Sequence, residues 1–311
     1  MATCAAFFAL SSSQVLASEE PQVFAPGVIS GQLSDASPAF APDGKTLFFM
    51  RGTEGQWTIL ESHRKNARWS EPQTAPFSGK WRDLDPVMAP DGSFLLFVSN
   101  RPATAQGSPI DASSRGKDYP GMGMNIWRVN RHGNSWDAPI RLPDVINTSS
   151  STFAPSAARD GSVYFIGRDS TGRDDLYLLR SQYQDGNYLP ATVVAIGDES
   201  TQIRDPEIAP DESFIVFSTK SAASNQPYRL AIAFRKDGHW GTSVDLGDGV
   251  NGPSYNMGSR LGADHRTLYF YNNRRVEHLN SPGENAWNNG SDNIWYLSLA
   301  PWIDARRSTP Q

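Results

Sequence analysis

Apolar and polar residues alternate in short runs along this chain, with the two-residue period of half-buried β-strands. The segment Asn125-Ile126-Trp127-Arg128-Val129 shows this alternation, and Thr46–Met50 and Phe94–Ser99 are almost entirely apolar. No segment of ten or more residues has the 3.6-residue apolar spacing of an amphipathic helix. The pattern therefore predicts an all-β protein.

One sequence pattern occurs five times, and each copy joins an apolar segment to a strand through a turn of Pro-Asp-Gly type. The copies are SPAFAPDGKTLFFM (37–50), DPVMAPDGSFLLFV (85–98), APSAARDGSVYFIG (154–167), DPEIAPDESFIVFS (205–218) and the weaker GSRLGADHRTLYFY (258–271). The turn aspartates Asp43, Asp91, Asp160, Asp211 and Asp264 are separated by 48, 69, 51 and 53 residues. An insertion near 101–124 accounts for the long interval, so the underlying period is about 50 residues, as in propeller blades.

A third strand-like run follows every copy and a fourth follows each of the first four copies, which gives four strands per repeat. The third runs are 57–62, 125–130, 175–180, 228–235 and 293–299, and the fourth are 69–77, 136–142, 188–196 and 240–246. Four antiparallel strands in each repeat predict a β-propeller, with blades starting near residues 35, 83, 152, 203 and 256. Five blades are favoured; because the fifth copy is weak, six blades are the alternative.

The fifth repeat has no fourth strand of its own before the chain ends. Residues 21–30 (PQVFAPGVIS) resemble 71–77 (EPQTAPF) and 138–145 (APIRLPDV), which belong to fourth strands. We therefore expect the N-terminal segment to supply the outer strand of the last blade, which leaves no open sheet edge. Residues 18–311 are predicted to form a single domain.

Residues 1–17 are interpreted as a probable signal peptide. Residues 2–10 are apolar or small, and Val15-Leu16-Ala17 precedes the polar Ser18-Glu19-Glu20, as at a cleavage site. No Lys or Arg lies near Met1, so the charged start of a signal is absent; a disordered tail or a buried segment is the alternative. The interpretation predicts a periplasmic or secreted protein.

The amino-acid composition excludes several classes of binding partner and several kinds of chemical site. The formal net charge is −5 and the pI is about 5.6, which argues against a nucleic-acid-binding protein. No apolar run reaches the ~20 residues of a membrane span. The single cysteine, Cys4, excludes a disulfide within the chain, and the five histidines lack the spacing of a metal motif. We expect no metal and no cofactor.

Several motifs carry a resemblance to a known family. They are Pro38–Gly44, Asp85–Gly92, Phe97–Arg101, and the third-strand segments Asn125-Ile126-Trp127 and Asp292-Asn293-Ile294-Trp295. Over about residues 35–299 the chain resembles the TolB-type, WD-like propeller repeat family. The resemblance implies a propeller, and the same repeats accompany peptidoglycan-binding domains. TolB has six blades and a separate N-terminal α/β domain, so its partner is not carried over to these five repeats.

The two longest connections indicate where a ligand would bind. In a propeller, the segments before the innermost strands and after the second strands share one face, and loops 101–124 and 272–292 both follow second strands. Long loops in a compact domain are usually functional or disordered, so this face is the predicted binding face. Its candidate ligand-binding residues are Trp81, Arg82, Asp83, Asp85, Arg204, Asp205, Glu207, Tyr255, Asn256 and Arg260.

Carboxylates are expected to converge at the mouth of the channel on this face. They are Asp35, Asp83, Asp85, Asp205 and Glu207. A pair of them flanking a sugar bond would act as in glycosidases, some of which are five-bladed propellers. Asp35, Asp85 and Asp205 recur in the motif and have basic residues available as partners, which favours a structural role. Asp83 and Glu207 are therefore the preferred catalytic pair if the protein is an enzyme.

Three functions remain open at this point. The leading hypothesis is an exported, non-catalytic propeller that binds an envelope protein or peptidoglycan through the face bearing loops 101–124 and 272–292. The alternative is a glycan-active hydrolase that uses Asp83 and Glu207. A third possibility is a module that binds a small molecule in the central channel.

Overall fold

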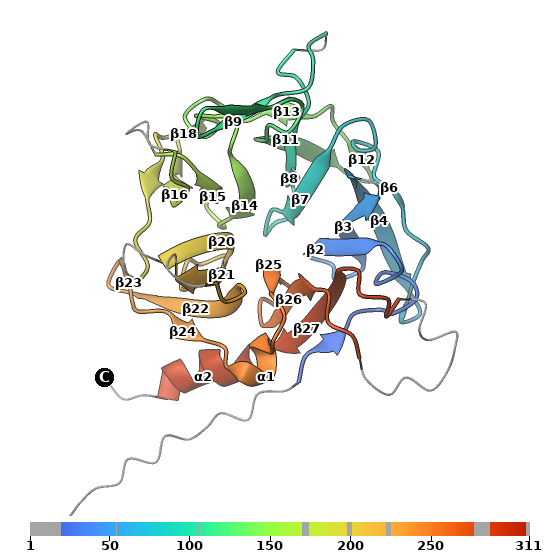
Figure 1. Cartoon of the computed structure of the whole chain (residues 1–311), viewed down its shortest axis with the longest axis vertical. Coiled ribbons are helices and arrows are strands. Elements are labelled where there is room, and N and C mark those ends of the chain that lie inside the picture. The colour runs from blue at the N-terminus through green and yellow to red at the C-terminus, as the bar shows by residue number, and fades with distance from the viewer. Residues whose placement is uncertain are drawn as a thin grey trace, which may run out of the picture.

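The computed structural model describes residues 20–53, 55–104, 106–169, 174–197, 201–221, 225–276 and 287–308. Its main sheets are antiparallel and form five blades around one axis (Figure 1). The predicted all-β, five-bladed propeller is therefore confirmed. The predicted signal peptide, residues 1–17, lies outside the described residues.

The first three strands of each blade follow one another outward from the axis. The innermost strands are β2 (Ser34–Phe40), β7 (Asp83–Met88), β14 (Phe153–Ala157), β20 (Thr201–Ile208) and β25 (Met257–Leu261). The second strands are β3 (Thr46–Thr53), β8 (Phe94–Ser99), β15 (Val163–Gly167), β21 (Phe214–Ser221) and β26 (Thr267–Asn272). The third strands are β4 (Gln56–Lys65), β11 (Asn125–His132), β16 (Tyr177–Ser181), β22 (Arg229–Lys236) and β27 (Asn293–Ser298).

The outer edges are made of short strands that pair with the third strand of their own blade. In the first four blades these are β5 (Arg68–Trp69), β6 (Gln73–Thr74), β12 (Ser135–Trp136), β13 (Ile140–Arg141), β19 (Thr192–Val193), β23 (His239–Trp240) and β24 (Val244–Asp245). A small ribbon of β17 (Tyr183–Gln184) and β18 (Asn187–Tyr188) accompanies the third blade.

The N-terminal segment completes the fifth blade. Strand β1 (Gln22–Val23) pairs antiparallel with β27, and the Ser30 hydroxyl donates to the Ile294 carbonyl oxygen at 3.2 Å. Both ends of the chain therefore share one blade, as the sequence predicts.

The core lies between neighbouring blades because side chains alternate between the two faces of each middle strand. Phe48 of β3 belongs to the apolar cluster shared with the second blade, whereas Phe49 belongs to the cluster shared with the fifth. In β8, Phe97 packs toward the first blade and Val98 toward the third. Alternation along one strand thus binds a blade to both of its neighbours.

The sequence shows no helical periodicity over ten or more residues, and the two helices of the described residues are shorter than that. A short helix, α1 (Asp248–Asn251), precedes β25, and α2 (Ala300–Ser308) runs along the outer edge of the ring (Figure 1). In α2, Trp302 and Ile303 are buried beside Leu299. Two adjacent buried residues in a nine-residue helix leave no repeated apolar stripe, so the periodicity did not predict it.

Strand register defines two faces of the ring. Asp35 of β2 pairs with Arg51 near the end of β3, and Asp83 of β7 pairs with Ser99 at the end of β8. We call this side, where innermost strands begin and second strands end, the entry face; the Pro-Asp-Gly turns lie on the turn face. Loops 101–124 and 272–292 both leave second strands at the entry face, as predicted. The first carries a hairpin of β9 (Ala112–Ser114) and β10 (Lys117–Tyr119).

Candidate functional site at the propeller axis

Every innermost strand contains a β-bulge with a left-handed residue at the same position. The register shifts in all five strands, and the residues there with positive φ are Ser37 (49°), Asp85 (47°), Ala154 (49°), Asp205 (47°) and Gly258 (67°). A positive φ is uncommon outside glycine and costs backbone energy. Its repetition around the axis forms one layer of five equivalent residues.

Two members of this layer are carboxylates, and each accepts a hydrogen bond from a neighbouring blade. Asp85 accepts a hydrogen bond from the Ser37 hydroxyl at 3.3 Å. Asp205 accepts one from the Gly258 N–H at 2.9 Å. The other members are small, so the two carboxylates are the layer's ionisable groups.

Asp205 and Asp85 have different surroundings. Asp205 is only 8% exposed, whereas Asp85 is half-buried. Burial, together with the negative charge of Asp85, raises the pKa of Asp205 to about 6. Near pH 6 the buried carboxyl therefore carries a proton about half of the time.

Tyr271 of β26 lies beside this pair because its neighbour is a glycine. A Cβ on Gly258 would lie 2.4 Å from the Tyr271 ring, so any larger residue would displace the ring. Burial and the charges of Asp205 and Asp85 raise the pKa of Tyr271 well above its usual value. The phenol therefore stays protonated and can donate a hydrogen bond.

A second carboxylate–phenol pair extends the site toward the rim. The Tyr255 hydroxyl donates to the Asp292 carboxylate, and burial raises the pKa of Asp292. Asp292 also acts on the pKa of Tyr271, which places both pairs in one electrostatic group. We call Asp85, Asp205, Tyr255, Tyr271 and Asp292 the axial site.

Arginines surround and underlie the axial site. Arg82 and Arg204 are half-buried; the charge of Asp85 acts on the pKa of Arg82, and the charge of Arg204 acts on the pKa of Asp205. Arg260 is 1% exposed; from the fifth blade its Nε donates to the Pro86 carbonyl oxygen of the second blade at 3.4 Å. Its Nη2 has no hydrogen-bond partner among the described residues. A buried, unpaired guanidinium N–H has free capacity for a polar group of a ligand.

The preferred sequence pair, Asp83 and Glu207, is not brought together. Asp83 is equivalent to Asp35: it is fully buried and pairs with Arg101 at 2.7 Å, as Asp35 pairs with Arg51 at 2.6 Å. Glu207 lies four positions further along its strand than the Asp83 equivalent, about 13 Å at ~3.3 Å per residue. The sequence analysis grouped Asp35 with Asp85 and Asp205, whereas the structure groups it with Asp83.

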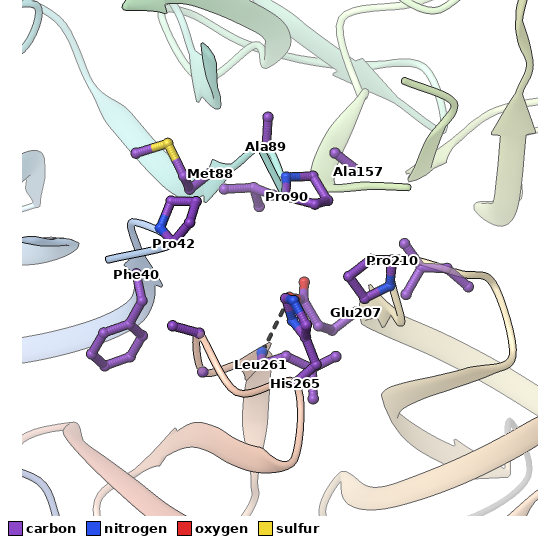
Figure 2. Close-up of a pocket in the computed structure, with 14 residues that line it drawn as sticks. Phe40, Pro42, Met88, Ala89, Pro90, Ala157, Glu207, Pro210, Leu261 and His265 are labelled. Carbon is purple, nitrogen blue, oxygen red and sulfur yellow. Dashed lines mark hydrogen bonds between the residues drawn. The ribbon is translucent and has the colours of Figure 1, made fainter. Parts of the chain in front are cut away.

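Glu207 instead serves the turn face. It accepts hydrogen bonds from the Ser156 hydroxyl at 3.0 Å and the Leu261 N–H at 3.1 Å. Figure 2 shows its carboxylate beside His265 in a pocket bordered by three turn prolines, Pro42, Pro90 and Pro210. The pocket volume is about 50 Å³, which suits one or two waters. Glu207 is therefore a structural carboxylate.

Two other sequence candidates also have local structural roles. The buried Asn256 side chain donates to the Asn251 carbonyl oxygen at 2.6 Å and accepts from Asn272 at 2.8 Å. Trp81 is half-buried beneath the Lys80 ammonium, 5.2 Å from its ring centroid. Neither interaction involves the axial site.

Tyr271 and Asp292 are the axial residues that sequence reasoning missed. The sequence analysis placed Asp292 in a third-strand segment and Tyr271 at the end of the fifth copy of the repeat, and gave neither a binding role. The available signal was Gly258, which stands where other repeats carry a side chain and so leaves room for a neighbour.

No group of three or more His, Cys, Asp or Glu side chains among the described residues is placed to hold a metal ion. In the same part of the chain, no helix is long and apolar enough to span a membrane.

Solved structures with the same architecture include several glycoside hydrolases. The α-L-arabinofuranosidase of Lactobacillus brevis is 10% identical, with 88% of this chain and 92% of that chain covered and a TM-score of 0.50. The α-L-arabinofuranosidase PaAbf62A of Podospora anserina, solved with cellotriose, is 12% identical, with 90% and 96% covered and the same TM-score. These similarities show the fold alone.

TolB from Acinetobacter baumannii is 19% identical over 68% of this chain, with a TM-score of 0.41. The match covers 43% of TolB, so this chain spans less than half of that protein. No family model matches the sequence, and no curated protein matches it.

Proposed function

We propose that this protein is a glycan-directed hydrolase whose acid and base are Asp205 and Asp85. The observation that carries the proposal is the pair itself: two carboxylates in one layer, one buried with a pKa raised to about 6 and one half-exposed. Pairs of titratable groups whose surroundings differ in this way are typical of acid–base sites.

Three residues of the axial site and the neighbouring Arg260 have direct roles in this proposal. Protonated Asp205 donates its proton to the glycosidic oxygen as the bond breaks. Asp85 either activates a water or attacks the anomeric carbon, and the distance between the carboxylates decides which. The Tyr271 hydroxyl and the free Nη2 of Arg260 donate hydrogen bonds to sugar hydroxyls.

The structural comparisons suggest the first substrates. The similar propellers named above are arabinofuranosidases. Arabinose-containing oligosaccharides are therefore the first substrates to test.

The test is a hydrolysis assay on such oligosaccharides with the wild type and with Asp205→Asn, Asp85→Asn and Asp118→Asn. Asp118 is exposed on the β9–β10 hairpin, so it is a control for loss of one surface carboxylate. We expect both axial variants to keep the fold and to lose at least about 100-fold in kcat/KM, with the control unchanged. Full activity of either axial variant would contradict the assignment.

The same assignment predicts the pH dependence. Because Asp205 must be protonated to act as the acid, kcat/KM should fall tenfold per pH unit above about pH 6. A rate profile between pH 4 and pH 8 measures this. A rate that stays constant up to pH 8 would exclude Asp205 as the acid.

Binding of an envelope protein or peptidoglycan is a second candidate function, favoured by the loop at 101–124. Tyr119 and Met122 in this loop are 39% and 46% exposed, unlike most large apolar side chains of the ring. Pull-down from envelope extract and co-sedimentation with peptidoglycan test it, comparing the wild type with a chain in which a Gly-Ser linker replaces residues 104–121. Equal binding by both chains would exclude the loop as the contact.

A further inference from the structure

A polar pocket borders the axial site on the entry face. Its volume is about 730 Å³, and the lining residues used below are Ser254, Asn273, Arg274, Arg275, Asn289 and Gly290. Ser254 immediately precedes Tyr255 of the axial site. Arg274 follows Tyr271 by three residues, a reach of about 10 Å at ~3.3 Å per residue. One extended ligand can therefore contact the pocket and the axial site together.

Two adjacent arginines give this pocket its charge. Arg274 lies over the Trp295 ring at 5.2 Å and donates from Nη2 to the Val250 carbonyl oxygen at 2.9 Å. Its buried Nε has no hydrogen-bond partner among the described residues. The exposed Arg275 donates from Nη2 to the Asn289 carbonyl oxygen at 2.6 Å.

Neither guanidinium forms an ion pair with a carboxylate in the described part of the chain, where other arginines such as Arg51, Arg101 and Arg229 do. Burial lowers the pKa of Arg274, and among the described residues no neighbouring negative charge offsets this shift. The two positive charges are thus uncompensated by described acidic groups, although the protein carries a net charge of −5.

Two glycines allow the guanidinium groups to lie close to the backbone. A Cβ on Gly252 would lie 3.2 Å from Arg274 Nη2, and one on Gly290 would lie 3.1 Å from Arg275 Nη2. Both glycines have positive φ, 50° and 92°, so side chains are disfavoured there for two reasons. The loops hold both arginines at the pocket in a fixed arrangement.

We propose that this pocket binds an anionic substituent, a carboxylate or sulfate ester, of a glycan whose neutral part reaches the axial site. The inference rests on the proposed function and names its substrate class as acidic glycans. Guanidinium groups bind both anions through charge-assisted hydrogen bonds, and the Ser254 and Asn273 side chains are available as further donors.

The experiment measures binding by calorimetry. The probes are trigalacturonate, its methyl ester, and a sulfated galactose trisaccharide, titrated into the wild type, Arg275→Gln, Arg274→Lys and Arg68→Gln. The methyl ester has the size of the acid without its charges. Arg68→Gln removes one exposed positive charge on β5, far along the chain from the pocket, and is the matched control. Hydrolysis of each probe is followed in parallel.

We expect the wild type to bind at least one anionic probe about tenfold or more tighter than the methyl ester. Arg275→Gln should remove most of this preference and Arg274→Lys part of it, with Arg68→Gln unchanged. The anionic probe that binds tighter identifies the substituent. Equal affinity for charged and uncharged probes, or a preference that survives Arg275→Gln, would overturn the inference.

The two proposals fail differently. Hydrolysis of neutral oligosaccharides without any preference for charged probes would sustain the hydrolase and refute the anionic subsite. Charge-selective binding that depends on Arg275, without turnover of any glycan, would sustain the subsite and refute the hydrolase.

Discussion

Glu212 has an unfavourable backbone conformation, and the hydrogen bonds of its side chain compensate for it. It has φ 57° at the turn position where the first three repeats have Gly44, Gly92 and Gly161, all with positive φ. Its carboxylate accepts hydrogen bonds from Tyr164 at 2.8 Å and from Arg180 and Arg235 at 2.7 Å. Tyr164 and Arg180 belong to the third blade and Arg235 to the fourth, so the side chain joins two blades.

Glu212→Gln should destabilise the protein by about 2–3 kcal/mol, because two charge-assisted hydrogen bonds are lost. Burial alone would raise the pKa of Glu212, but the bonds from Arg180 and Tyr164 lower it overall. Its contribution is therefore present at neutral pH and lost as the pH falls through the lowered pKa. Urea denaturation at pH 7 and pH 3 measures both effects, with exposed Glu71→Gln as the control. Equal loss of stability at both pH values would contradict this role.

At the residue scale, the motif alone could not assign the carboxylates. Asp85 and Asp205 both precede a proline in the repeat, so their equivalence is visible in the sequence. The equivalence of Asp83 with Asp35 is not visible in the sequence. The first repeat has Ser37 at the position of Asp85, so the two repeats are difficult to align there. A positive φ at a residue other than glycine cannot be recognised from the amino-acid sequence. The layer that contains both Asp85 and Asp205 is therefore visible only in the structure.

At the scale of elements, residues 22–30 close the ring between the first and fifth blades, and we call this segment the clasp. Phe24 contacts four aromatic rings from the first and fifth blades, Phe40, Trp69, Tyr269 and Tyr296, at centroid distances of 5.2–6.1 Å. Ile29 is fully buried between the same two blades. A strand of only two residues is thus fixed mainly by the side chains that flank it.

Ile29→Ala should cost about 2–5 kcal/mol, the usual range for truncating a fully buried isoleucine. Leu33→Ala, at a residue 43% exposed, is the control and should change stability by less than about 0.5 kcal/mol. Chemical denaturation measures both. If the two variants are equally stable, the clasp contributes little to the ring.

The sequence predicted these elements well because each blade repeats the same burial pattern. Alternation in β11 and the Asp-Gly turns located strands to within a few residues, and the likeness of 21–30 to other outer segments placed β1. Helix α2 was not predicted because Trp302 and Ile303 are the only buried residues among its described side chains. Both pack against residues of the fourth and fifth blades, so the helix depends on contacts that are distant in sequence.

At the scale of the whole molecule, buried carboxylates shape the pH dependence of stability. Burial raises the pKa of Asp35 to about 6, and burial with the charge of Asp85 does the same for Asp205. A carboxyl whose pKa is raised by folding makes its full contribution to stability below pH 3.8, the pKa of the unfolded chain. This contribution is lost as the pH rises from there through about 6. Asp211, Asp245 and Glu212 act in the opposite direction, with lowered pKa values.

Stability should therefore be greatest near pH 4, decline by a few kcal/mol between about pH 4 and pH 6, and stay level above that range. Denaturation midpoints across pH 3–8 measure this profile. Asp205→Asn should flatten the decline between pH 4 and pH 6 while the profile below pH 4 stays unchanged. A maximum at pH 8 in the wild type would contradict the assignment of these two carboxylates.

The shared fifth blade sets the order in which the ring is assembled. Ser30 and Ile294 are 264 positions apart, so their hydrogen bond closes nearly the largest loop that the chain can form. Four blades can form from contacts between near neighbours in sequence, but this junction must wait until both extremities are present, and long loops are slow to close. We therefore expect closure of this junction to be the last folding event and its opening to be the first step of unfolding.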